Sequence, residues 1–169
     1  LGLPDESEEV APNFQHYPAE SIPEVQLGDV RLSLVAGRVL GARSPVAVFS
    51  PLCYLVATLA PGQRFDWIRH YPEEAVYVID GSVEINDETF ASHRMVVLPD
   101  AEHVRVASED GAMIAVLGGE PLGKRFLEWN FVSSSRERLA AAAKLWDQGG
   151  FDRVPGDEEF IPLPEKLRR

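Results

Sequence analysis

Cysteine is almost absent from this sequence, and so are other features that would assign the chain to a class. Cys53 is the single cysteine in 169 residues, so the chain cannot form a disulfide within itself. That usage fits a reducing compartment, and we predict a cytoplasmic protein. No apolar run reaches about 18 residues, the minimum for a membrane-spanning helix, so we predict no contact with a membrane.

Positive charge is also scarce. Lysine and arginine together number 16 against 27 aspartates and glutamates, which leaves a formal net charge of −11. Direct binding of nucleic acid needs clustered basic residues to neutralise phosphates, so this composition argues against it. An acidic surface could still meet the basic face of a protein partner, although solubility alone is a sufficient explanation of the charge.

The middle of the chain carries a repeated strand pattern. Between residues 26 and 118, roughly nine short stretches with strand character follow one another, separated by turn residues at the spacing typical of a sandwich or barrel. Cys53–Leu59 is apolar on both faces and predicts a central strand, in which Cys53 would be a small buried hydrophobe. Pro45–Ser50 predicts a shorter strand. This regular meander predicts an all-β fold, a cupin-type double-stranded β-barrel or jelly roll.

The two flanks of this region have a different texture. Residues 1–25 are rich in proline and acids and predict a linker or arm that lies over a surface. Residues 119–169 predict a loop, one C-terminal α-helix and an extended, docked tail. A capping box at Ser134 and Glu137 indicates where the helix begins, and Gly149 indicates where it ends. The apolar stripe of the helix consists of Leu139, Ala142, Ala143 and Trp146.

One stretch of the barrel region has a pattern for metal chemistry. The first cupin motif runs Gly, five residues, His-x-His, three or four residues, Glu, six residues, Gly. Gly62 and Gly81 bracket this pattern here, and His70 and Glu74 occupy the second His position and the Glu position. Ile68 replaces the first His. Side chains two apart on a strand face the same way, so the motif places Ile68 and His70 on one face, with Glu74 pointing into the same barrel mouth.

The second cupin motif fits less well. It runs Gly, five residues, Pro-x-Gly, two residues, His. His93 stands in the first Gly position and Pro99 falls in place, but Ala101 replaces the inner Gly and His103 comes one residue early. On a strand that slip would turn the imidazole away from the barrel, whereas a loop after Pro99 could absorb it. An exposed loop position is the simpler expectation for His93.

The candidate metal ligands are therefore His70, Glu74 and His103, with open positions for a divalent transition metal. The alternative is an eroded site, in which the same side chains only line a pocket or bond within the protein. Ile68 in a ligand position favours the eroded site. No nucleophile arrangement and no phosphate-binding loop is indicated, so we predict neither a catalytic nor a cofactor-binding residue.

The flanks carry further specific segments. They are Leu1-Gly2-Leu3-Pro4, Tyr17–Glu24, Gly119–Gly123, Trp129–Ser135 and Val154–Pro164. Together they resemble the C-terminal half of bacterial pirin-family proteins, with the first two similar to the segment between the two domains of that family. The likeness covers nearly the whole chain.

The resemblance implies a two-domain cupin whose single metal, usually iron, is held in the N-terminal cupin by three His and one Glu. The C-terminal cupin of that family lacks a metal, so no residue here corresponds to a family ligand and no cofactor is expected in this half. Family members are linked to quercetin 2,3-dioxygenase activity and, in eukaryotes, to transcriptional co-regulation. The chain, which does not start with Met, would then be a fragment of a longer protein.

Three functions are consistent with these observations. In the first, the chain is the structural partner of a missing, metal-bearing N-terminal cupin, and its uncovered apolar surfaces make it a homodimer. In the second, it is a single-domain cupin dioxygenase or isomerase that uses His70, Glu74 and His103. In the third, it is a non-catalytic module whose acidic surface binds a regulator. Quercetin 2,3-dioxygenase-like activity would belong to the full-length parent.

Overall fold

The computed structural model describes residues 2–101, 103–153, 156 and 158–165. These residues form two compact units, each with its own packing. Residues 11–121 form one, named the barrel unit, and residues 1–10 with 122–169 form the other, named the tail unit. The arm expected over residues 1–25 is thus shared between the two units, because its first ten residues group with the end of the chain.

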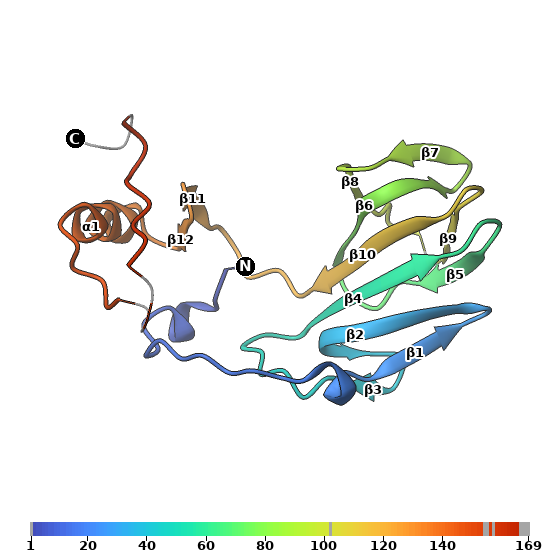
Figure 1. Ribbon diagram of the computed structural model, residues 1–169, viewed down its shortest axis with the longest axis horizontal. Helices are drawn as coiled ribbons and strands as arrows, with labels where there is room; N and C mark the ends of the chain where they lie inside the picture. The colour runs from blue at the N-terminus through green and yellow to red at the C-terminus, as the bar shows by residue number, and fades with distance from the viewer. Residues whose placement is uncertain (1, 102, 154–155, 157, 166–169) are drawn as a thin grey trace. The chain divides into compact units, whose positions relative to one another are not determined.

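The barrel unit is built from antiparallel strands, as the sequence pattern predicts (Figure 1). A short 3-10 turn, η2 (Ala19–Ser21), precedes them. The strands are β1 (Glu24–Leu27), β2 (Val30–Val39), β3 (Ala42–Arg43), β4 (Leu52–Leu59), β5 (Arg64–Ile68), β6 (Glu73–Ile85), β7 (Glu88–Ala91), β8 (Met95–Val97), β9 (His103–Ala107) and β10 (Ala112–Gly119). They are ordered β1-β2-β4-β10-β6-β9-β5, with β3 beside β2 and with β7 and β8 beside β6. The predicted all-β fold is confirmed.

Strand β6 joins the two sides of the barrel unit. Its first half pairs with β8 and β10, and its second half pairs with β7 and β9. A register shift of the β6–β10 ladder between Met113 and Ile114 accompanies the change and leaves one extra residue, Ile79, on β6, as expected for a bulge that bends a sheet. A side chain near the start of β6 can therefore point into the interior of the barrel.

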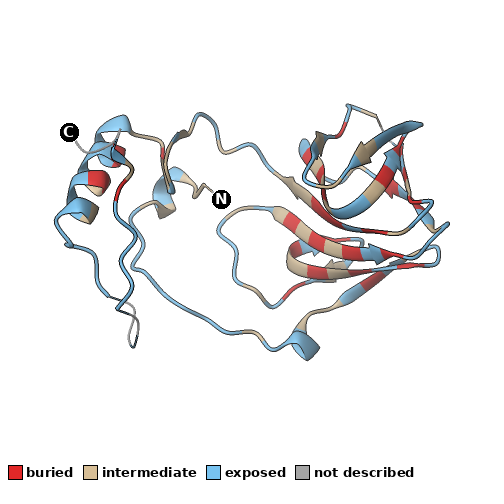
Figure 2. Ribbon diagram, turned by 45° about the horizontal axis from the view of Figure 1, so that its top comes forward, coloured by how far each residue is buried: buried red, intermediate tan, exposed pale blue. Residues whose placement is uncertain are grey.

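Strand β4 lies at the centre of its sheet, between β2 and β10, as predicted. Its buried positions alternate strictly, beginning with Cys53 at 2% exposure. The outward positions, Tyr54 and Val56, are half-buried rather than polar, which is why the strand looked apolar on both faces. Figure 2 shows the same alternation of buried and partly exposed residues along the neighbouring strands.

The strand predicted over Pro45–Ser50 is wrong, because the structure has a loop there. The buried hydroxyl of Ser44 donates a hydrogen bond to the carbonyl of Val35 at 2.7 Å and accepts one from the amide of Val46 at 3.2 Å. Such side-chain bonds offer the backbone an alternative to a strand ladder. Pro45 and Pro51, which cannot donate, further disfavour a paired strand.

The tail unit contains the predicted helix. Its elements are η1 (Asp5–Ser7), β11 (Phe126–Glu128), β12 (Phe131–Ser133) and α1 (Arg136–Asp147). The capping box at Ser134 is corrected by one residue, since the hydroxyl of Ser135 accepts the amide hydrogen of Arg138. Gly149, with φ of +66°, follows the helix end as expected. No helix in the described part of the chain is long and apolar enough to cross a membrane.

The predicted apolar stripe of α1 is the face that packs. Leu139 and Ala143 are buried, and the Trp146 ring contacts the rings of Trp129, Phe131, Phe151 and Phe160. The ring of Phe160 stacks on Trp146 with 5.6 Å between centroids, and the indole donates a hydrogen bond to the carbonyl of Ile161 at 2.9 Å. The extended tail is therefore docked on the helix, within the tail unit. Val154, Pro155 and Asp157, part of the tail segment singled out above, lie outside the described residues.

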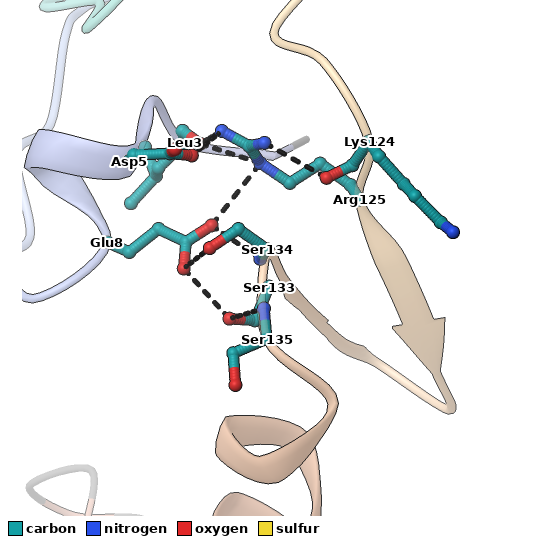
Figure 3. A network of polar contacts seen from close by, with 8 residues as sticks. All are labelled: Leu3, Asp5, Glu8, Lys124, Arg125, Ser133, Ser134 and Ser135. Atoms are coloured by element: carbon teal, nitrogen blue, oxygen red, sulfur yellow. Dashed lines mark hydrogen bonds and ion pairs between the residues drawn. The ribbon is translucent and has the colours of Figure 1, made fainter.

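Several carboxylates fasten the start of the chain within the tail unit, and Glu8 makes the most contacts among them (Figure 3). Glu8 accepts hydrogen bonds from the Ser133 hydroxyl at 2.8 Å, the Ser134 amide at 2.8 Å and the Ser134 hydroxyl at 3.1 Å. It also lies 3.3 Å from the guanidinium of Arg125, which in turn contacts Asp5 at 2.6 Å. Residues more than a hundred positions apart in the chain are held together here by charge-assisted bonds.

This arrangement predicts a pH dependence of the tail unit. The Ser133 hydroxyl is the largest of several contacts that hold the pKa of Glu8 below its ordinary 4.5, against the opposing effect of desolvation. A depressed pKa in the folded state stabilises the fold above the unfolded pKa, and this stabilisation is lost as the pH falls through the folded pKa. We expect hydrogen exchange of the α1 amides to lose protection as the pH drops below 4.5.

The matched variants are Glu8→Gln and Glu6→Gln. Glu8→Gln should lower the protection of α1 at neutral pH and reduce its acid dependence, because the glutamine cannot change charge. Part of the acid dependence should remain, because the pKa of Glu137 in the first turn of α1 is also lowered, chiefly by a backbone hydrogen bond. Glu6 is exposed and should respond as the unaltered chain does. Equal acid sensitivity of all three proteins would show that Glu8 does not control the unit.

Candidate functional site

Strand β5 sets which side chains of the motif-bearing stretch face the interior. Phe65 and Trp67 are buried at 3% and 1% exposure, whereas Asp66 and Ile68 are exposed. Ile68, in the position of the first cupin His, therefore points out of the barrel with 47% of its surface exposed. The expectation that this position faces a metal cavity is corrected, because the alternation of the strand gives the interior to Trp67.

Glu74 is the one candidate ligand in the interior. It lies at the start of β6 and is only 3% exposed. Its Oε2 accepts a hydrogen bond from the indole nitrogen of Trp67 at 2.7 Å. Its Oε1 accepts the backbone amides of His70 at 2.9 Å and Tyr71 at 3.0 Å. Both carboxylate oxygens are thus engaged by protein donors, which is how a buried carboxylate is normally stabilised.

His70 lies just beyond the end of β5 and is exposed. Its ring packs edge-on against Trp67, with 5.2 Å between the ring centroids. Together with Tyr71 and the β2–β3 turn it lines a hollow of about 620 Å³. It is the backbone of His70, not the imidazole, that contacts Glu74.

His103 is the first residue of β9 and pairs directly with Ile68 of β5. Directly paired residues of antiparallel strands point to the same side of the sheet, and both side chains are exposed. His103 therefore lies on the outer face while Glu74 lies inside. Because His103 comes one residue early in the second motif and lies on a strand, its imidazole points away from the barrel interior.

These placements allow a test of whether the site fits a metal. Among the residues that the structure describes, no group of three His, Cys, Asp or Glu side chains is arranged to hold a metal ion. Two imidazoles face solvent, and the interior carboxylate already accepts three hydrogen bonds. His93 is also exposed and occupies a turn with φ of +64°. The donor set does not fit a cupin metal centre.

Side chains outside the motif positions fill the interior around Glu74. A Cβ atom on Gly118 would come within 3.0 Å of the Glu74 Cγ and 3.1 Å of both the Cys53 Sγ and the Tyr71 Cδ2. The barrel mouth is therefore closed by Cys53, Tyr71 and Trp67 around one carboxylate. The sequence contains a signal for the role of Trp67. Trp67 lies two residues after Phe65 and so shares its inward face, and a buried indole N–H needs a hydrogen-bond acceptor in the interior.

Cys53 is inert in this setting. It is buried as predicted, and burial together with the nearby charge of Glu74 raises the pKa of its thiol to about 12. The thiolate, rather than the thiol, is the nucleophilic form. Cys53 therefore packs as a small hydrophobe.

Comparison with known proteins gives a consistent result. Residues 54–152 match the family model described as the pirin C-terminal cupin domain. A pirin-like protein of Caulobacter vibrioides is 40% identical over 168 residues, covering 98% of this chain and 58% of that protein. A protein of Pseudomonas aeruginosa, described as a candidate quercetin 2,3-dioxygenase, is 31% identical, covering 99% of this chain and 55% of its own length.

A solved structure shares the fold. The crystal structure of a quercetin 2,3-dioxygenase from Acinetobacter baumannii superposes with a TM-score of 0.84 at 25% sequence identity, covering 97% of this chain and 56% of that one. The chain thus spans about half the length of the relatives it matches.

Proposed function

The chain belongs to the pirin family and corresponds to its C-terminal cupin domain, and from this premise we propose that it is the structural partner of a metal-bearing cupin half. In this proposal the metal, iron or another divalent transition metal, and any quercetin 2,3-dioxygenase-like activity reside in that other half. A reducing, cytoplasmic setting is part of the proposal, since Cys53 is the only cysteine.

The observation that carries the proposal is an apolar outer face on the barrel sheet. Strands β8, β6, β10 and β4 are aligned so that their outward side chains form two adjacent rows across the sheet. The first row is Val97, Ala75, Leu117 and Tyr54, and the second row is Met95, Tyr77, Ala115 and Val56. We name these eight residues the apolar rows. An antiparallel sheet that faces water on one side normally carries polar residues there.

The apolar rows are exposed at β8 alone, because Ala115 is buried and the other five residues are half-buried. Val97 is 76% exposed and Met95 is 58% exposed. Contiguous apolar surface of this kind marks an interaction site on a protein that is otherwise strongly charged. Relatives about twice as long supply a candidate cover, a second cupin half.

The interior of the barrel also supports a structural role for this half and a metal-binding role for the other half. Glu74 is bonded to Trp67 and to two backbone amides, so its role is to close the barrel mouth. A half whose motif residues hold the fold together would leave metal chemistry to its partner.

The test is whether the apolar rows mediate association. We expect the isolated chain to form a homodimer through them and to bind the remaining half of a pirin supplied as a separate polypeptide. Val97→Asp should abolish both, because it places a charge on the exposed end of the rows without disturbing the core. Val48→Asp, at a partly exposed valine elsewhere on the barrel unit, is the matched control. Sedimentation velocity measures both associations.

The proposal would be contradicted if the Val97→Asp variant still associated. It would also be contradicted if the unaltered chain stayed monomeric and did not bind the second half. Metal analysis of the same samples addresses the enzyme alternative. A stoichiometric transition metal that is lost with activity in His70→Ala would favour the single-domain dioxygenase or isomerase instead.

A further inference from the structure

One hollow of the barrel unit borders the β2–β3 hairpin and shares Tyr71 with the surroundings of Glu74. It is an open cleft of about 1000 Å³, within the size range of small-molecule sites. The loop over residues 44–51 forms one wall, and the β2–β3 hairpin forms the other. Tyr71 lies at its base, with its hydroxyl 2.8 Å from the carbonyl oxygen of Arg38 and 3.1 Å from that of Leu52. The base is therefore fixed to both β2 and β4.

Two arginines on the hairpin line this cleft. Arg38 of β2 and Arg43 of β3 are direct cross-strand partners, so their side chains leave the sheet on the same side. Both are exposed, and no described carboxylate forms an ion pair with either. Arg31, Arg69 and Arg105 of the same unit are each paired with an acid. Arg64 of the same unit likewise forms no ion pair with a described acid, so what distinguishes Arg38 and Arg43 is that they are adjacent and line one cleft.

Adjacent like charges on paired strands repel each other, and this arrangement lowers stability unless an anion lies between them. Arginine is suited to that role because its planar guanidinium donates two parallel hydrogen bonds to a carboxylate or phosphate. The cleft therefore has a built-in preference for a negative group at the hairpin wall.

The opposite wall is apolar. Val48 and Phe49 are 41% and 47% exposed, and Pro45, Pro51 and Leu52 extend the same wall. An exposed phenylalanine ring can stack on a flat ligand at a favourable offset. The wall is firm, because the buried Ser44 fixes the start of the loop through its bonds to Val35 and Val46.

We propose that this cleft binds a small aromatic anion, with its carboxylate or phosphate between Arg38 and Arg43 and its ring against Phe49. The inference goes beyond the structural role proposed above and does not depend on it. It uses neither the apolar rows nor the Glu74 carboxylate, although Tyr71 borders both the cleft and the interior around Glu74.

The test uses three probes with the same ring system: 2-naphthoate, 2-naphthyl phosphate and the neutral 2-naphthamide. Binding to the full chain is measured by isothermal titration and by chemical-shift changes of the amides of residues 44–52. We expect one or both anions to bind and the amide to bind at least about tenfold more weakly, since charge-assisted hydrogen bonds account for that difference. Comparison of the two anions identifies the preferred head group.

The variants separate charge from contact. Arg38→Gln and Arg43→Gln should each weaken anion binding about tenfold and leave amide binding unchanged. Arg64→Gln makes the same charge change at an exposed position of β5 outside the cleft and should have no effect. Phe49→Ser should weaken all three probes. The proposal is overturned if the anions fail to bind, if the amide binds equally well, or if Arg64→Gln matches the cleft variants.

Discussion

Replacing Glu74 with alanine is expected to lower the free energy of unfolding of the barrel unit by about 3 kcal/mol. The carboxylate accepts the Trp67 indole and two backbone amides at the barrel mouth. Removing it leaves a buried indole N–H and two partly buried amides without an acceptor, and each unsatisfied buried donor costs about 1–3 kcal/mol. Urea unfolding, followed by near-ultraviolet circular dichroism, measures the loss.

Glu73→Ala is the matched control for this experiment. Glu73 is the preceding residue of the same strand, is exposed and should change stability by less than about 0.5 kcal/mol. Glu74→Gln should fall between the two, because its amide oxygen can still accept while its NH₂ group faces a donor. If Glu74→Ala were as mild as Glu73→Ala, the carboxylate would have no structural role and its burial would need a functional explanation.

Gly37→Ala is expected to cost at least about 4 kcal/mol, enough to prevent folding of a marginally stable domain. Gly37 lies in β2 opposite Cys53 and has φ of +82°. A Cβ atom there would lie 1.8 Å from the carbonyl oxygen of Leu52, which is backbone and cannot turn aside. Strands β2 and β4 must separate to admit the methyl group. This separation would also disrupt the base of the arginine-lined cleft.

Gly62→Ala isolates the backbone-strain part of that effect, and the difference between the two variants gives the steric part. Gly62 has φ of +79°, nearly that of Gly37, but its Cβ would meet nothing within 4 Å. Only the strain of the left-handed backbone should remain, about 1–2 kcal/mol. Equal losses in the two variants, measured by urea unfolding, would show that the contact with Leu52 relaxes at little cost.

Much of the architecture could be predicted because it depends on local pattern. The central strand Cys53–Leu59 and the stripe of the helix follow from apolar spacing, and both are confirmed. The apolar run within Pro45–Ser50 also predicts a strand, but the structure has a loop there. The loop conformation of this segment depends on a hydrogen bond from Ser44 to Val35, nine residues away, which the spacing of apolar residues cannot predict.

The candidate site shows more clearly what the sequence could not predict. The spacing from Gly62 to Gly81 identified His70 and Glu74 as motif positions, and the resemblance assigned the chain to a family that the comparisons confirm. The pattern could not tell which face of β5 points inward. That choice depends on which side chains fill the barrel, and Trp67 fills it in place of Ile68.

The sequence by itself therefore determined the fold class, the family and the helix, because each is encoded in residue spacing or in local motifs. Only the tertiary structure decided what the motif residues do. Glu74 bonds to Trp67 inside the barrel, while His103 pairs with Ile68 on the outer face. The physical reason is that the inward or outward direction of a strand side chain is set by long-range packing, and a change of one residue in phase reverses it.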